Sequence, residues 1–68
     1  MRTLVLDVPG AHCGACRAAI VSALQAAVGV VSTEVDVRRR LATVTFDEHR
    51  VTAAALRDLL ATAGYPPA

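Results

Sequence analysis

The sequence lacks several features on which whole classes of protein depend. It has no tryptophan and no lysine, and its only aromatic residues are Phe46 and Tyr65. Single-stranded nucleic acid is commonly bound by stacking bases on aromatic side chains, so this composition argues against such a function. Seven arginines against six acidic residues give a formal net charge of +1, which cannot supply the basic surface of a phosphate-binding protein. We therefore expect no nucleic-acid partner.

The chain also lacks a long apolar run. Its longest apolar stretch, residues 18–31, is interrupted by Ser22, Gln25 and Gly29, and falls short of the ~20 residues that span a bilayer. The acidic Asp7 comes too early for the apolar core of a secretory signal. We therefore expect a cytoplasmic location. Because thiols are kept reduced there, the two cysteines of the chain are expected to serve ligation or redox chemistry, and not a structural disulfide.

The size and composition indicate one folded unit. The chain has 68 residues, of which 54% are hydrophobic and 19% charged, and this is too apolar for a disordered protein. A single core in so short a chain is close to the lower limit of stability. We expect residues 1–68 to form a single domain.

Two periodicities divide the chain into elements. Apolar residues alternate with polar ones over residues 3–8, 31–37 and 42–46, which predicts three strands. In the second strand, this alternation places Val31 on the same face as the following odd-numbered residues. Between the last two strands stands Arg38–Arg40, a turn without Gly or Asn, which is therefore unlike the primed two-residue type. This run either marks a docking face or is a solvated hairpin tip, and the second interpretation is favoured.

Helical spacing predicts two helices. The first spans about residues 15–27, with Gly29 as a left-handed residue after its end, and its apolar stripe holds Ile20, Leu24 and either Ala27 or Val28. The second spans residues 53–63, with Thr52 as N-cap and Gly64 at its C-terminal end.

The order of these elements predicts the fold class. Only Tyr65-Pro66-Pro67-Ala68 follow the second helix, and proline cannot donate a ladder hydrogen bond, so a fourth strand is stunted or missing. The order strand, helix, strand, strand, helix is that of an α+β, ferredoxin-like βαββα(β) sandwich, with an antiparallel sheet and two helices on one face.

The candidate site is Cys13-Gly14-Ala15-Cys16, where the first strand gives way to the first helix. The spacing i, i+3 brings both sulfurs to one side of the first turn, and the helix amino terminus favours thiolate over thiol. Two soft ligands without a carboxylate cluster favour copper(I) over zinc, which usually takes four ligands. The same motif also occurs in redox proteins and zinc sites, so the motif alone leaves these alternatives open.

The segment Gly10 to Cys16 resembles the GMxCxxC loop of the heavy-metal-associated domain, and the resemblance extends to the terminal Gly64-Tyr65. That family occurs in copper chaperones and in the amino-terminal domains of copper-transporting P-type ATPases. The resemblance, which is strongest to the bacterial copper chaperones, implies that Cys13 and Cys16 bind copper(I). It implies further that the ion passes by thiolate exchange to a partner's cysteine pair in a transient complex, and that no enzymatic reaction is involved.

Two positions of the loop depart from or add to the family pattern. Ala11 stands where the family usually has a methionine that packs under the loop. His12 precedes the first cysteine, and its imidazole either acts on the site, as a third ligand, as a cap or by admitting zinc(II), or is a solvent-facing side chain. Both interpretations of His12 remain open.

Two further residues are candidates for supporting roles. Tyr65 matches a position at which bacterial copper chaperones place a tyrosine near the metal loop, where it either screens the ion or fills the sheet edge. Arg17 either offsets the negative charge of a bis-thiolate copper(I) site or is a solvated arginine. The missing fourth strand leaves the first strand as an edge, so a homodimer, with or without shared metal, is a further expectation.

The leading hypothesis is a cytosolic copper(I) chaperone that delivers to a P-type ATPase and meets the membrane only through that partner. An amino-terminal metal-binding domain of a copper or zinc P-type ATPase is the alternative within the same class. From other classes, a dithiol redox protein with Cys13 as nucleophile and a metal-sensing or buffering module remain as alternatives.

Overall fold

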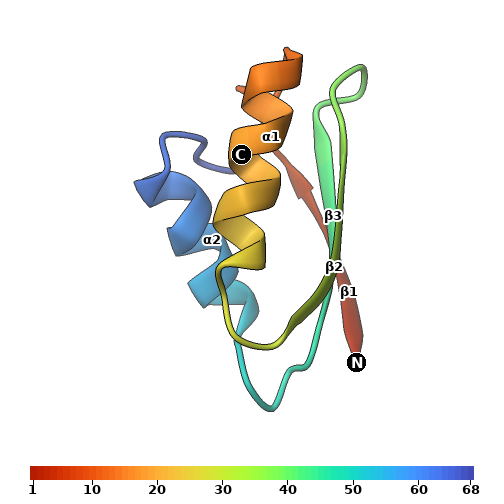
Figure 1. Cartoon of the computed structure of the whole chain (residues 1–68), viewed down its shortest axis with the longest axis vertical. Coiled ribbons are helices and arrows are strands. Elements are labelled where there is room, and N and C mark those ends of the chain that lie inside the picture. The colour runs from red at the N-terminus through yellow and green to blue at the C-terminus, as the bar shows by residue number, and fades with distance from the viewer.

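The computed structural model describes residues 1–68 and confirms the predicted order of elements (Figure 1). The elements are β1 (Arg2–Asp7), α1 (Gly14–Gln25), β2 (Val30–Asp36), β3 (Leu41–Phe46) and α2 (Ala53–Thr62). Neither helix has the length and apolar character that a membrane crossing requires.

The three strands form one antiparallel sheet in the order β1-β3-β2, and both helices lie on the same side of it (Figure 1). This is the predicted ferredoxin-like arrangement without a fourth strand. The C-terminal segment contributes one backbone hydrogen bond beside β1, from Ala68 N–H to the Asp7 carbonyl at 2.7 Å. Both β1 and β2 are therefore edge strands.

The core lies between the sheet and the helix pair. It draws Leu6 from β1, alternate residues from β3 and one stripe from each helix, because these are the positions that face inward. The loop after β1 adds Val8 and Ala11. Its ten buried members are Leu6, Val8, Ala11, Ile20, Leu24, Ala42, Val44, Phe46, Leu56 and Leu60. None of them is polar or charged. Burying a side chain of the size of Val, Leu, Ile or Phe stabilises the fold by about 1.5–3 kcal/mol before entropy is counted.

Both ends of α2 follow the prediction. The Thr52 side chain accepts a hydrogen bond from a backbone N–H of the first turn, which caps the helix. At the other end Gly64 has φ +94, a conformation that residues with a Cβ rarely adopt. Tyr65 N–H donates to the Leu60 carbonyl at 2.8 Å, and Gly64 N–H donates to the Ala61 carbonyl at 3.1 Å. This pair of bonds is a Schellman motif, and it turns the chain so that Tyr65 returns toward α1.

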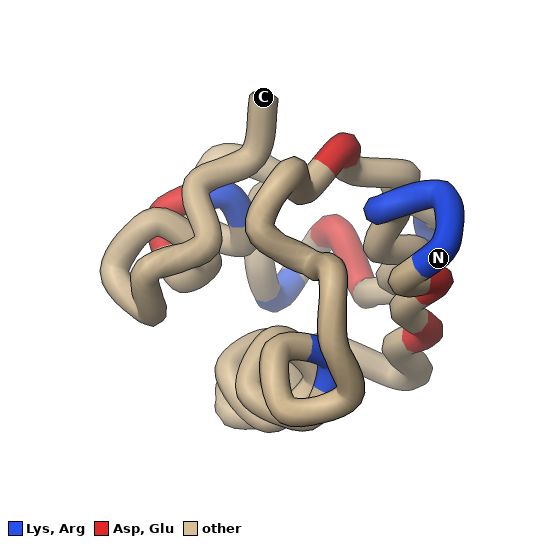
Figure 2. The backbone as a smooth tube through the Cα atoms, turned by 90° about the horizontal axis from the view of Figure 1, so that it is seen from above, with Lys and Arg blue, Asp and Glu red and all other residues tan.

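The connection between β2 and β3 has four residues, in agreement with the expectation that it is not a two-residue primed turn. The Asp36 carboxylate accepts the backbone N–H groups of Arg38 and Arg39, at 3.0 and 3.2 Å, and Arg40 has φ 57. The Arg40 carbonyl accepts the Val8 N–H at 2.8 Å, which ties the hairpin to the segment that follows β1. Seen from above, the three consecutive arginines form a long blue segment at this tip (Figure 2).

Two predictions of detail were wrong. The first helix ends at Gln25 instead of Ala27, and Val31 does not share the face of Thr33 and Val35, since it is 59% exposed. The second error has a local cause, because the pairing of β2 with β3 shifts register between Val30 and Ser32. That irregularity turns Val31 outward and lets Val30 pack against the core.

Candidate metal centre

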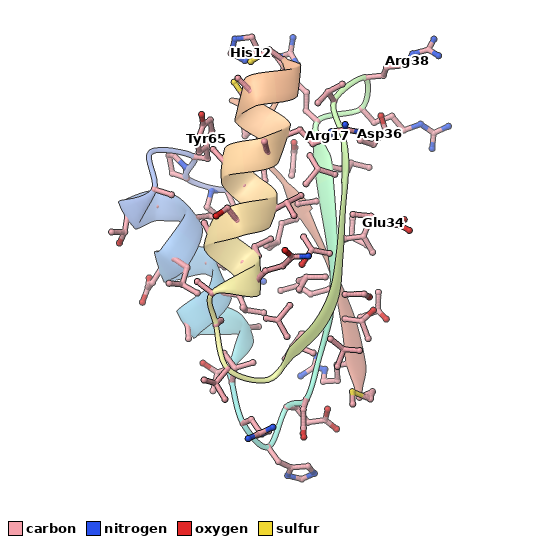
Figure 3. All side chains as sticks on the ribbon, viewed as in Figure 1. His12, Arg17, Glu34, Asp36, Arg38 and Tyr65 are labelled. Carbon is pink, nitrogen blue, oxygen red and sulfur yellow. The ribbon has the colours of Figure 1, made fainter.

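The loop between β1 and α1 lies at one end of the long axis of the molecule, where Figure 3 labels His12. Ala11 anchors the loop, because its side chain is fully buried in the core and its N–H donates to the Val8 carbonyl at 3.0 Å. Gly10 allows the loop to pass close to Tyr65, since a Cβ at this position would lie 3.1 Å from Cδ1 of the tyrosine ring. Ala11 thus points inward, beneath the loop that carries the cysteines.

The structure brings the two predicted sulfur ligands together on the first turn of α1. Cys13 is the N-cap, and its Sγ accepts the backbone N–H of Cys16 at 3.2 Å. Both cysteines are free thiols, Cys13 exposed and Cys16 half-buried. The two side chains are therefore reachable by an ion and by the ligands of a partner.

The surroundings of Cys16 favour its thiolate form. Hydrogen bonding with Cys13 lowers the pKa of the Cys16 thiol, and hydrogen bonding with Tyr65 lowers it further. The same interaction with Cys16 raises the pKa of Tyr65, because it favours the protonated phenol as a donor. Thiolate is the form of cysteine that binds metal, so these contacts prepare the site for an ion.

His12 is exposed and its ring is engaged with the loop backbone. Its Nδ1 lies 2.7 Å from the Gly10 carbonyl oxygen. A carbonyl only accepts, so Nδ1 carries the hydrogen, and in a neutral imidazole Nε2 is left with a free lone pair. The structure contains no cluster of three or more His, Cys, Asp or Glu side chains placed to hold a metal. It therefore gathers Cys13 and Cys16 but does not add His12 to them as a third ligand.

The two supporting candidates differ in their relation to the site. Tyr65 is half-buried and points toward the end of the molecule where His12 lies (Figure 3). Arg17 is exposed in the first turn of α1 and has no carboxylate partner, since the structure holds one ion pair, between the amino terminus and Glu48. Of these two, only Tyr65 is placed to act on a cysteine.

One property of the site was not foreseen from the sequence. The sequence predicts Cys13 as a metal ligand or, in the redox alternative, as a nucleophile, yet Cys13 also caps α1 through its sulfur. The residue types preferred at N-caps, Ser, Thr, Asp and Asn, did not point to this role. The signal available was positional: Cys13 immediately precedes the helix and lies three residues before the N–H that its Sγ accepts.

Comparisons with known proteins agree with this geometry. The model of the heavy-metal-associated domain matches residues 5–66. The mercuric transport protein periplasmic component of Shewanella putrefaciens is 40% identical over 65 residues, covering 96% of this chain and 71% of the relative. The CopZ metallochaperone is 30% identical with a TM-score of 0.94, covering 98% of this chain and all of the other. The copper-binding domain from HMA7, a P-type ATPase, is 28% identical with a TM-score of 0.95, covering 100% and 92%.

Proposed function

The chain belongs to the heavy-metal-associated domain family, and on that premise we propose that it is a copper(I) chaperone that binds one ion through Cys13 and Cys16. The family makes it a metal-binding domain and not an enzyme. Membership of this family argues against the dithiol redox alternative. In addition, neither of the two surface pockets is lined by Cys13.

The observation that carries the proposal is the pair of free thiols on the first turn of α1. Copper(I) accepts a low coordination number and soft ligands, whereas zinc(II) in structural sites takes four. Because the structure gathers no further ligand around the pair, the site suits an ion that is satisfied by two sulfurs. Tyr65, at the position expected from the bacterial copper chaperones, contributes by lowering the pKa of Cys16.

The exposure of the cysteine site would allow the bound ion to pass to a partner protein. The site lies at the end of the molecule (Figure 3) and Cys13 is exposed, so an incoming thiolate can attack the bound ion before the first sulfurs leave. We propose a copper-transporting P-type ATPase as the acceptor in the cytoplasm, in keeping with the similarity to a domain of such an ATPase. An amino-terminal domain of a copper or zinc P-type ATPase remains the alternative, with the same site and the same exchange chemistry.

Mercury(II) is a second candidate cargo, because a 40% identical relative is a mercuric transport protein component. Mercury(II) is also a soft ion that two thiolates satisfy. This relative is named as periplasmic, so a mercury cargo would also bring the proposed cytoplasmic location into question.

The test is an anaerobic copper(I) titration of the reduced protein against a chromophoric competing chelator, with the mass of each complex read by native mass spectrometry. Zinc(II) and mercury(II) are titrated in the same way. One copper(I) per monomer, bound more tightly than zinc(II) and passed to an acceptor with its own cysteine pair, supports the proposal. Failure to compete for copper(I) while competing for mercury(II) would replace it by the second candidate.

The same titration on His12→Ala decides the role of the imidazole. Because His12 is not gathered with the cysteines, we expect the copper(I) affinity to change by less than about threefold, which corresponds to under 1 kcal/mol. A larger loss, or a change from a metal-linked homodimer to a monomer, would make His12 a ligand.

A further inference from the structure

A surface groove of about 980 Å³ lies between α1 and the edge strand β2. Its α1 wall includes Ala18 and Ser22, and its β2 wall includes Thr33 and Val35. Small side chains of α1, those of Ala18 and Ser22, leave room on this side of the groove. One end of the groove lies at Arg17. Because Arg17 directly follows Cys16, this end adjoins the loop that carries the cysteines.

The β2 wall of the groove carries unpaired backbone groups. The Arg40 carbonyl, just before β3, accepts the Val8 N–H beside β1, whereas the Asp47 N–H, just after β3, donates to the Gly29 carbonyl beside β2. Alternation between these two ends directs the odd-numbered residues of β3 toward β2. The β2 residues opposite those positions include Glu34. Consequently Thr33 and Val35 direct their N–H and C=O groups away from the sheet, along the edge that β2 forms.

A polar side chain in the same wall also lacks a partner. The Thr33 Oγ1 is buried and makes no hydrogen bond. A buried hydroxyl without a partner costs free energy that one donor or acceptor from a bound segment would recover. The unpaired backbone groups and the unpaired hydroxyl therefore lie on the same wall of the groove.

The charges beside the edge indicate what kind of strand fits. Glu34 and Asp36 lie on the sheet face opposite the helices, and both are exposed. Figure 3 shows Glu34 pointing away from α1. An added strand would alternate its side chains between that acidic face and the groove under α1, so basic residues suit one set of positions and small apolar residues the other.

We propose that this groove binds an extended peptide segment with alternating basic and apolar residues, which adds to the sheet as a strand beside β2. The backbone of the segment pairs with Thr33 and Val35, its apolar side chains enter the groove against Ala18 and Ser22, and its basic side chains lie beside Glu34. Main-chain hydrogen bonds give such binding its affinity, and the alternate side chains give it selectivity. The site is separate from the metal ligands, so the inference holds whatever ion they carry.

A second copy of this chain fits the edge less well than a basic peptide. Antiparallel pairing of two β2 strands centred on Val35 sets Glu34 of one copy opposite Asp36 of the other. Pairing centred on Glu34 sets two glutamates opposite each other. Like charges directly opposite are destabilising, so both of these registers are disfavoured for a second copy. Pairing centred on Thr33 sets Glu34 opposite Ser32 instead, but it lacks the favourable opposite-charge pair that a basic peptide would make with Glu34.

The inference is tested by amide NMR of the metal-free, reduced full chain titrated with an acetylated and amidated heptapeptide of alternating lysine and valine. We expect changes in amide chemical shift confined to residues 17–26 and 31–36.

Two matched pairs of variants test which residues bind the peptide. Ala18→Leu fills the groove and is expected to abolish the chemical-shift changes. Ala19→Leu, also exposed on α1 but outside the groove, is expected to leave them unchanged. Glu34→Gln is expected to weaken binding about two- to fivefold, the range of one exposed cross-strand charge pair, and Asp58→Asn on α2 to have no effect.

Three results would overturn the proposal. The first is the absence of shifts at millimolar peptide, and the second is shifts on the β1 edge in place of β2. The third is equal binding of the same peptide with alternate backbone nitrogens methylated, which would show attraction of charge without strand pairing. A peptide with glutamate in place of lysine should bind more weakly than the lysine peptide. Equal binding of the two peptides would contradict the proposal that basic side chains of the segment lie beside Glu34.

Discussion

At the scale of single residues, Tyr65 is the side chain with the clearest expected effect on the site. Hydrogen bonding with Tyr65 lowers the pKa of Cys16, second to the contribution of Cys13. Tyr65→Phe removes the hydroxyl and keeps the ring beside Gly10, so we expect the pKa of Cys16 to rise toward that of an ordinary thiol. The measurement is the pH dependence of alkylation at Cys16, located by peptide mass spectrometry. A titration unchanged in Tyr65→Phe would assign the lowered pKa of Cys16 to its other neighbours.

Cys16 makes the stability of the metal-free protein depend on pH. The pKa of Cys16 is lower in the folded chain than in the unfolded chain, so the folded state binds fewer protons between those two values. The free energy of unfolding should therefore rise with pH across this interval and fall as pH drops through the folded pKa. Urea unfolding under reducing conditions at a series of pH values measures this slope. Cys16→Ser should flatten it, and a slope that survives in this variant would have to come from another group.

At the scale of elements, Cys13 joins the metal site to the stability of α1. Its Sγ caps the helix by accepting the Cys16 N–H. Cys13→Ser supplies one of the preferred N-cap residues and Cys13→Ala supplies none, so Cys13→Ala should be less stable than Cys13→Ser by about 1 kcal/mol. Both variants should lose tight copper(I) binding, because each leaves one sulfur. Urea unfolding of the metal-free proteins and the competition titration measure the two effects separately. Full copper(I) affinity in either variant would show that Cys13 is not a ligand.

The second helix offers a matched test of capping without any metal chemistry. The Thr52 side chain accepts the Ala55 N–H at 3.1 Å, so Thr52→Ala should lower the free energy of unfolding by about 1 kcal/mol. Thr62 is exposed at the other end of α2, and Thr62→Ala should change it by less than about 0.5 kcal/mol. Equal effects in chemical denaturation would mean that the Thr52 hydroxyl does not cap the helix.

Elements with local signals were predictable from the sequence, and features that depend on tertiary contacts were not. The cap at Thr52 and the left-handed Gly64 follow from residue type and position. The outward turn of Val31 depends on how β2 registers against β3, which the alternation of one strand cannot reveal. The groove between α1 and β2 likewise appears only when two elements pack together. At the candidate site, the meeting of Cys13 and Cys16 on the first turn of α1 was predictable from their spacing, but the hydrogen bond between His12 and Gly10 was not.

At the scale of the whole molecule, a small core makes metal binding and folding interdependent. Ten residues of 68 are buried, and a core in a chain of this length rarely supplies more than about 3–5 kcal/mol. Leu24 is fully buried, and Leu24→Ala should lower the free energy of unfolding by about 2–5 kcal/mol, enough to leave much of the metal-free protein unfolded.

Copper(I) is expected to rescue this variant. An ion that binds only the folded state adds RT ln(1 + [L]/Kd) to the free energy of unfolding, which is about 2.7 kcal/mol at a free-ion concentration of one hundred times Kd. Copper(I) buffered at that level should therefore restore the circular dichroism of Leu24→Ala and raise its Tm. The double variant Leu24→Ala, Cys16→Ser should not respond, and rescue of the double variant would mean that copper(I) stabilises the fold from somewhere other than the cysteine pair.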